Sequence, residues 1–161
     1  MDYLEAKGPT FARYFCSKLV KGEEYFLQID SHTFFEPNWD ENLIKMLEQT
    51  RYAKEVSVKH PMGPEGSKKP VLSVYPPTDK QLKLDGFPCM DNFKIGANNI
   101  PVFLAGFWSG KKDKPVRSAK PFIAAGLMFC DANFLNEVPY DPNLSNIFMG
   151  EEILFSARMF T

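Results

Sequence analysis

Short apolar runs alternate along the chain with stretches that carry helical signals. Four apolar runs are predicted to form strands: 25–29, 71–75, 101–105 and 121–125. Three stretches are predicted to form helices: one that starts at Gly8-Pro9-Thr10, one that follows Asn38, and one over 151–160. This alternation predicts an α/β layer fold, in which the four strands share one mixed sheet flanked by helices.

Capping residues predict where the helices begin and end. Pro9 suits the first turn of a helix, and Gly22 is expected to end that helix. Asn38, with Glu41 three residues later, is typical of an N-cap and its partner ahead of a second helix. The segment 78–99 is rich in proline, glycine, aspartate and asparagine, and is predicted to be a loop.

Composition favours one folded domain over residues 1–161 and excludes several kinds of partner. The 161 residues are 44% hydrophobic and carry a formal net charge of -1. Charges of both signs are interspersed, which argues against a nucleic-acid partner, and no stretch is predicted to span a membrane. The three cysteines are odd in number and lack a CxxC spacing, so neither a disulfide framework nor a zinc cage is expected. A reducing, cytoplasmic location is the simplest interpretation.

The sequence Asp30-Ser31-His32 directly follows the predicted strand 25–29. Ligands gather at the carboxyl ends of strands in open α/β sheets, so these residues are candidates for a site. Residues two apart in an extended segment point to the same side, which would let Asp30 and His32 share one ion. A carboxylate with an imidazole favours a first-row metal such as Mn²⁺ over Mg²⁺. An acid after a strand is also common as a turn residue, and this alternative stays open.

Three longer stretches occur in a fixed order along the chain. They are EAKGPTFARYFCSKLVKGEEYFLQIDSH, KPFIAAGLMFCDANFLNEVPYDP and FMGEEILFSARMFT. Together they resemble the GT-A glycosyltransferases, specifically the GlcNAc-transferase family that modifies hydroxyproline or threonine in proteins, a relative of the mucin-type polypeptide GalNAc transferases. The resemblance implies a Rossmann-like GT-A fold and retaining transfer of GlcNAc. The donor would be UDP-GlcNAc, the cofactor Mn²⁺ or another divalent cation, and the acceptor a hydroxyproline, threonine or serine hydroxyl of a protein or peptide.

The resemblance assigns roles to residues in the first stretch. Asp30 and His32 match the family's Asp-x-His metal motif, so Asp30 is also a catalytic candidate, and Ser31 between them is a donor-binding candidate. Arg13 matches an arginine that lies near the nucleotide in the relatives. A salt bridge is the alternative role for Arg13.

The other two stretches supply further candidates by the same resemblance. Ala125 and Gly126, with Ala124 before them, match small residues through which a loop backbone approaches the donor sugar, and tight packing under a turn is the alternative. Glu151 matches the glutamate of the Gly-Glu helix start that GalNAc transferases write as Trp-Gly-Gly-Glu-Asn. It is a candidate for donor binding and catalysis, against a role in complementing the helix dipole.

Three residues remain as additional candidates at these positions. Glu152 and Asp141 are further carboxylate candidates, and Glu152 is assigned to donor binding. Phe148 stands where the relatives have tryptophan, and would stack on a sugar or fill the core.

The resemblance also implies an interior part of the family's catalytic domain. In the family, a nucleotide-binding βα region precedes the GPTxAR helix, and a third metal ligand, a histidine, follows the Gly-Glu helix. A parent with an upstream anchor would place the reaction in the Golgi lumen instead of the cytoplasm. Two other functions stay open: a non-catalytic carbohydrate-binding module that keeps Phe107, Trp108 and Phe148, and a metal-dependent hydrolase that uses Glu151 as base beside Asp30 and His32.

Overall fold

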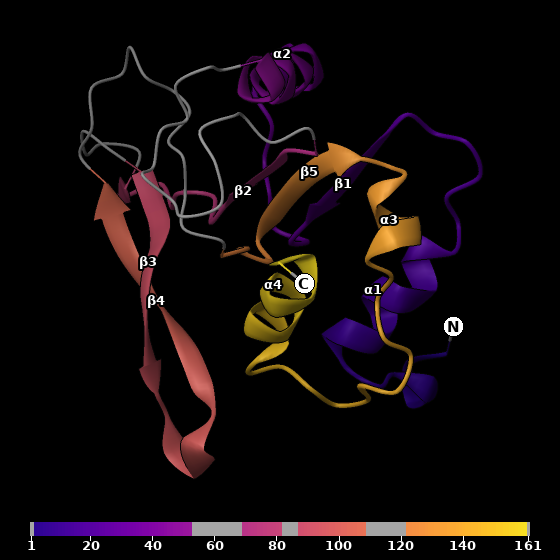
Figure 1. Cartoon of the computed structure of the whole chain (residues 1–161), viewed down its shortest axis with the longest axis vertical. Helices are drawn as coiled ribbons and strands as arrows, with labels where there is room; N and C mark the ends of the chain where they lie inside the picture. Colours follow the sequence, from indigo (N-terminus) through magenta and orange to yellow (C-terminus); the bar gives the residue numbers. More distant parts are fainter. Residues whose placement is uncertain (1, 53–68, 82–86, 109–121, 161) are drawn as a thin grey trace.

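The computed structural model describes residues 2–52, 69–81, 87–108 and 122–160 (Figure 1). Its helices are α1 (Pro9–Ser17), α2 (Trp39–Tyr52), α3 (Phe134–Glu137) and α4 (Glu151–Phe160), with 3-10 helices η1 (Tyr3–Glu5) and η3 (Ala97–Asn99). Its strands are β1 (Tyr25–Ile29), β2 (Val71–Val74), β3 (Phe87–Ile95), β4 (Pro101–Trp108) and β5 (Leu127–Asp131). The predicted mixture of helices and strands is confirmed.

The prediction of one mixed sheet is wrong. β1, β5 and β2 form a three-stranded sheet in that order, and both pairings are antiparallel. β4, predicted to join it, pairs instead with β3 in a separate two-stranded antiparallel sheet. Figure 1 shows this hairpin extending along one side of the molecule. The apolar content of a run predicts that it is buried, but not which strand it pairs with, and this explains the error.

The apolar run at 121–125 is not a strand in its described part, residues 122–125; residue 121 lies outside the described residues. The strand begins two residues later, at Leu127. Side chains satisfy the backbone of the run: the Ile123 N–H donates to Ser156 Oγ at 2.9 Å, and the Ala124 N–H donates to Ser73 Oγ at 2.7 Å. A buried apolar run can therefore satisfy its backbone without a ladder, which composition alone does not reveal.

The predicted loop at 78–99 contains a strand, so this prediction is wrong as well. β3 pairs with β4 from Phe87 opposite Trp108 to Ile95 opposite Pro101. A register shift between Met90 and Asn92 marks a bulge that takes up the irregularity. Turn-forming residues predict a loop here, but pairing with the long strand β4 orders the segment as a strand in spite of its local propensity.

The three-stranded sheet separates two apolar layers. On one face, Leu72 and Phe129 pack with Leu47 of α2. On the other face, Met128 packs with Ile123, Leu135 of α3 and Phe155 of α4, and Tyr14 of α1 packs against this cluster. Figure 1 shows α2 on one side of the sheet and α1, α3 and α4 on the other. Alternate residues of β5 thus feed opposite layers, as the two-residue period of a strand requires.

The predicted helix starts hold, including that of α1 at Pro9, whereas the predicted end of α1 does not. α2 begins at Trp39, directly after Asn38, and α4 spans 151–160 as predicted. α1 ends at Ser17 and not near Gly22, because the Leu19 N–H bonds to the Cys16 carbonyl in a tightened last turn. Across the described part of the chain, no helix combines the length and the apolar character needed to cross a bilayer.

Candidate functional site

The ends of three strands place Asp30, Gly126 and Tyr75 in one row. Leu127 is paired with Ile29, the last residue of β1, and with Val74, the last residue of β2. The residues one position further, Asp30, Gly126 and Tyr75, therefore lie side by side, on the face of the sheet opposite to that of Leu127 and its partners. The Asp30 N–H donates to the Gly126 carbonyl oxygen at 3.1 Å. A Cβ atom on Gly126 would lie 3.0 Å from Tyr75 Cδ1 and 3.5 Å from Asp30 Oδ2. Gly126 therefore makes room for the two side chains that flank it.

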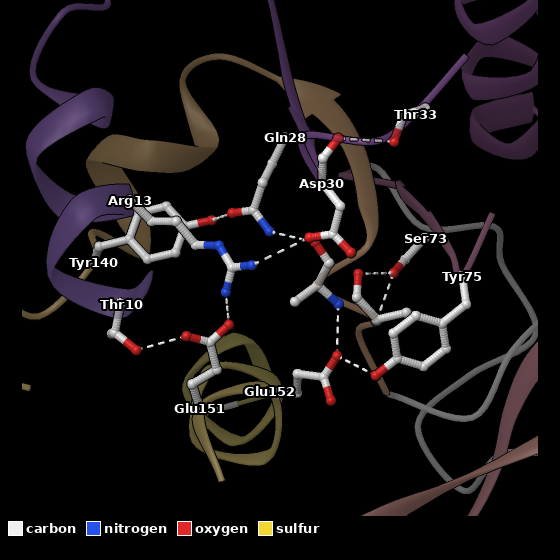
Figure 2. A network of polar contacts seen from close by, with 12 residues as sticks. Thr10, Arg13, Gln28, Asp30, Thr33, Ser73, Tyr75, Tyr140, Glu151 and Glu152 are labelled. Carbon is white, nitrogen blue, oxygen red and sulfur yellow. Dashed lines mark hydrogen bonds and ion pairs between the residues drawn. The ribbon is translucent and has the colours of Figure 1, made fainter. Parts of the chain in front are cut away.

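Arg13 of α1 lies between two carboxylates (Figure 2). Its Nη1 atom forms an ion pair with Glu151 Oε1, and its Nη2 atom lies 3.9 Å from Asp30 Oδ1. The Thr10 hydroxyl donates to Glu151 Oε2 at 2.5 Å. The Arg13 and Glu151 side chains are 18% and 11% exposed, whereas that of Asp30 is 41% exposed. Asp30 is thus the most open member of this cluster.

A close contact at Gly8 brings the N-termini of α1 and α4 together. Gly8 has φ +85°, and a Cβ atom there would lie 3.1 Å from Asn146 Cα. The Asn146 N–H donates to the Lys7 carbonyl oxygen at 2.6 Å, which joins the segment before α4 to the start of α1. Only glycine adopts this backbone conformation without cost beside such a close neighbour. The Gly-Pro-Thr sequence therefore sets the position from which Thr10 and Arg13 reach Glu151.

Glu152, the next residue of α4, points toward the sheet. Its Oε1 atom accepts a hydrogen bond from the Ala125 N–H at 2.7 Å and another from the Tyr75 hydroxyl. Burial raises the pKa of Tyr75, and the hydrogen bond and negative charge of Glu152 raise this pKa further. Tyr75 therefore remains a hydrogen-bond donor at neutral pH.

Gln28 completes the support of Ala125 from the side of β1. Its Nε2 atom donates to the Ala125 carbonyl oxygen at 2.9 Å, and its Oε1 atom accepts from the Tyr140 hydroxyl. Tyr140 is buried, and this burial raises the pKa of its hydroxyl. Both backbone polar groups of Ala125 are thus bonded to side chains.

A pocket opens beside this network. Its lining includes Arg13, Gln28, Ala125, Tyr140, Asp141 and Glu151. The buried residues Met128 and Phe155 also border it, so its floor is apolar while several of its walls carry polar groups. An apolar pocket with a few convergent polar groups is a typical setting for a ligand site.

The structure brings most of the predicted site residues into one network. This group contains Arg13, Asp30, Ala125, Gly126, Glu151 and Glu152, and Ala124 joins it through Ser73. Ser31 and His32 form an exposed turn after Asp30. Phe148 is 72% exposed ahead of α4. Phe107 and Trp108 belong to β4, but their side chains lie outside the described residues.

The chemistry of Asp30 and His32 suits a divalent first-row cation, but only in part. A half-exposed carboxylate and an exposed imidazole provide two ligands of the appropriate kind. Within residues 2–52, 69–81, 87–108 and 122–160, no three His, Cys, Asp or Glu side chains are grouped to hold a metal ion. A cation at Asp30 would therefore need further ligands besides these two side chains.

Several side chains of this network were missed in the sequence. They are Thr10, Gln28, Ser73, Tyr75 and Tyr140. Gln28 had a detectable signal, because it is the one polar residue of an otherwise apolar strand. Tyr75 was predicted only as a strand end, and its role depends on a pairing with residues far along the chain.

Comparison with known proteins gives one match. A scan against protein-family models matches residues 1–161 to the family described as glycosyltransferase (GlcNAc). Searches of curated proteins and of solved structures found no match. The family match covers every element described above, including the network around Arg13 and Asp30.

Proposed function

The chain belongs to the glycosyltransferase (GlcNAc) family, a family of transferase enzymes, and on this premise we propose that it carries the donor site for GlcNAc transfer. The donor is UDP-GlcNAc, and the acceptor is a hydroxyproline, threonine or serine hydroxyl of a protein. The transfer depends on a divalent cation and retains the anomeric configuration. The parent domain has a GT-A fold. The convergence of Arg13, Asp30 and Glu151 at the end of β1 is the observation that carries this proposal.

The charge of the cluster supports a cation-dependent reaction. Asp30 and Glu151 contribute two carboxylates, while Arg13 contributes one guanidinium group. The formal excess of negative charge favours a bound cation, and hard divalent cations prefer carboxylate oxygens. Asp30 is the carboxylate best exposed to receive it.

Asp30 and His32 would hold the cation, which offsets the negative charge of the departing diphosphate. Arg13 keeps the Asp30 carboxylate oriented through its 3.9 Å approach and shares its charge with Glu151. Glu151 lines the pocket and has lone pairs left to accept a hydrogen bond from a sugar hydroxyl.

The contacts of Glu151 and Glu152 support a front-face displacement, in which the acceptor attacks from the side of the leaving group without a covalent intermediate. Glu151 forms an ion pair with Arg13 and accepts a hydrogen bond from Thr10, and Glu152 accepts hydrogen bonds from Ala125 and Tyr75. Carboxylates bound in this way are poor candidates for a covalent nucleophile. The leaving phosphate oxygen then takes the proton of the acceptor hydroxyl, and the protein orients the two reactants.

Asp30→Asn tests this proposal in the full-length parent protein. The assay measures transfer from UDP-GlcNAc to hydroxyproline and threonine peptides with Mn²⁺. Loss of a preorganised charge should lower kcat by about a hundredfold or more, while the loss of stability should not exceed about 1 kcal/mol for a half-exposed side chain. Asp40→Asn, an exposed change on α2, is the matched control and should leave transfer unchanged. Full activity of a folded Asp30→Asn protein would contradict the proposal.

We place the reaction in the cytoplasm. The exposed thiol of Cys16 is free, and an exposed free thiol fits a reducing compartment. Fractionation of cells that express the tagged parent protein tests this location. Recovery with Golgi membranes would contradict it and favour the lumenal alternative.

A further inference from the structure

The segment 123–126 lies outside the strands, yet five residues in or directly after β1, β2 and α4 bond to its backbone. Gly126 receives the Asp30 N–H at its carbonyl oxygen, at 3.1 Å. The Ala125 N–H donates to Glu152 and its carbonyl oxygen accepts from Gln28, at 2.7 and 2.9 Å. The Ala124 N–H donates to the Ser73 hydroxyl, and the Ile123 N–H donates to the Ser156 hydroxyl. The position of this segment is therefore set by side chains, and single substitutions can loosen it.

One carboxylate oxygen joins the segment to two other parts of the fold. Glu152 Oε1 accepts hydrogen bonds from the Ala125 N–H and from the Tyr75 hydroxyl, as Figure 2 shows. The Tyr75 ring also lies against Gly126, with Cδ1 3.0 Å from the position that a Cβ atom would take. Glu152 thus links α4, the end of β2 and the segment that supports Asp30.

We propose that Glu152 and Tyr75 are a positioning pair for the reaction, and that Glu152 does not bind the donor sugar itself. They hold the Ala125–Gly126 backbone in place, and this backbone in turn bonds to the Asp30 N–H. The inference rests on the proposed function, because it assumes that Asp30 acts in the transfer. It replaces the donor-binding role that the family resemblance implied for Glu152.

The two roles for Glu152 predict different results for a conservative substitution. Glu152→Gln keeps a carbonyl oxygen that can accept from both Ala125 and Tyr75, so it should preserve the position of the segment. Glu152→Ala removes the acceptor and leaves the Ala125 N–H without it. A donor-binding carboxylate would instead be impaired by both substitutions, because both remove its negative charge.

The kinetic test uses the full-length parent with UDP-GlcNAc, Mn²⁺ and an acceptor peptide. Glu152→Gln should keep kcat and the donor KM within about threefold of wild type. Glu152→Ala should lower kcat about tenfold to a hundredfold, the usual effect of losing hydrogen bonds to a charged group, with the donor KM within about threefold. Tyr75→Phe should lower kcat about threefold to tenfold.

Combining Tyr75→Phe with Glu152→Ala should lower kcat no further than Glu152→Ala alone, because both changes remove contacts of the same oxygen. A donor KM raised equally by Glu152→Gln and Glu152→Ala would overturn the inference. Tyr75→Phe with unchanged kcat would overturn it too. Glu41→Gln, an exposed change on α2, is the matched control.

Amide hydrogen exchange at Ala125 tests the positioning without any assay of transfer. Protection of this amide should fall at least about tenfold in Glu152→Ala and stay near wild type in Glu152→Gln. Failure of the proposed function would appear as a wild-type parent that transfers no GlcNAc. Failure of this inference would appear as an active parent in which Glu152→Ala leaves the protection of the Ala125 amide unchanged.

Discussion

Removing the charge of Arg13 should destabilise the fold more than removing the charge of Glu151. The two side chains are 18% and 11% exposed, so their ion pair is closer to a buried pair than to a surface pair. Breaking a buried pair costs about 3–5 kcal/mol, and breaking a surface pair about 0–1 kcal/mol. Arg13→Met leaves both Glu151 and Asp30 without their cation, and should cost about 3 kcal/mol.

Glu151→Gln leaves a smaller defect. Arg13 still has Asp30 at 3.9 Å, and the new amide oxygen can still accept from the Thr10 hydroxyl. The free energy of unfolding should fall by about 1–2 kcal/mol, because the Arg13 guanidinium group keeps Asp30 as a charged partner. The order of the two losses therefore follows from the position of Arg13 between two acids.

Urea denaturation of both variants measures these losses as differences in the free energy of unfolding. The exposed pair of Lys69 and Glu137, with side chains 70% and 40% exposed, provides the control. Glu137→Gln should change the free energy of unfolding by less than about 1 kcal/mol. Equal losses for Arg13→Met and Glu151→Gln, or the reverse order, would refute the reasoning.

Two further predictions concern Gly126 and the cysteines. Gly126→Ala should lower the free energy of unfolding by about 1–2 kcal/mol. The contacts at 3.0 Å to Tyr75 and 3.1 Å to Pro76 outweigh the stabilisation that comes from the lower conformational entropy of the unfolded chain, and an unchanged or higher urea midpoint would contradict this. Burial raises the pKa of the Cys130 thiol to about 12, so a maleimide at pH 8 should label exposed Cys16 and spare Cys130 until the protein unfolds. Peptide mapping by mass spectrometry measures both sites, and equal labelling of the native protein would contradict the prediction.

Local signals predicted the elements that depend on local interactions. α2 begins directly after Asn38, as its capping pattern indicated, α4 spans the predicted residues 151–160, and β1 matches its apolar run. The sequence does not predict β3, because this segment becomes a strand by pairing with β4 and not through the propensities of its own residues. The run at 121–125 was assigned to a strand, because burial predicts apolar residues whether or not a ladder forms.

The carboxylates and Arg13 of the candidate site were found through their resemblance to family motifs, and the structure places these residues together. Gln28 and Tyr75 were not found, because their roles arise from the register of β5 against its two neighbours. Such register is a long-range property, and no motif of nearby residues encodes it.

The order of strands along the chain governs when the row of Asp30, Gly126 and Tyr75 can form. β5 is the middle strand of its sheet, yet it is made after β1 and β2, which pair with it and not with each other. During synthesis β1 and β2 are therefore made before their partner strand, and their unpaired backbone groups can form wrong pairings in the growing chain. When β5 joins them, it brings the acid, the glycine and the tyrosine together in one event. Nascent chains that end before Gly126 should consequently lack the whole row, however well their helices have folded.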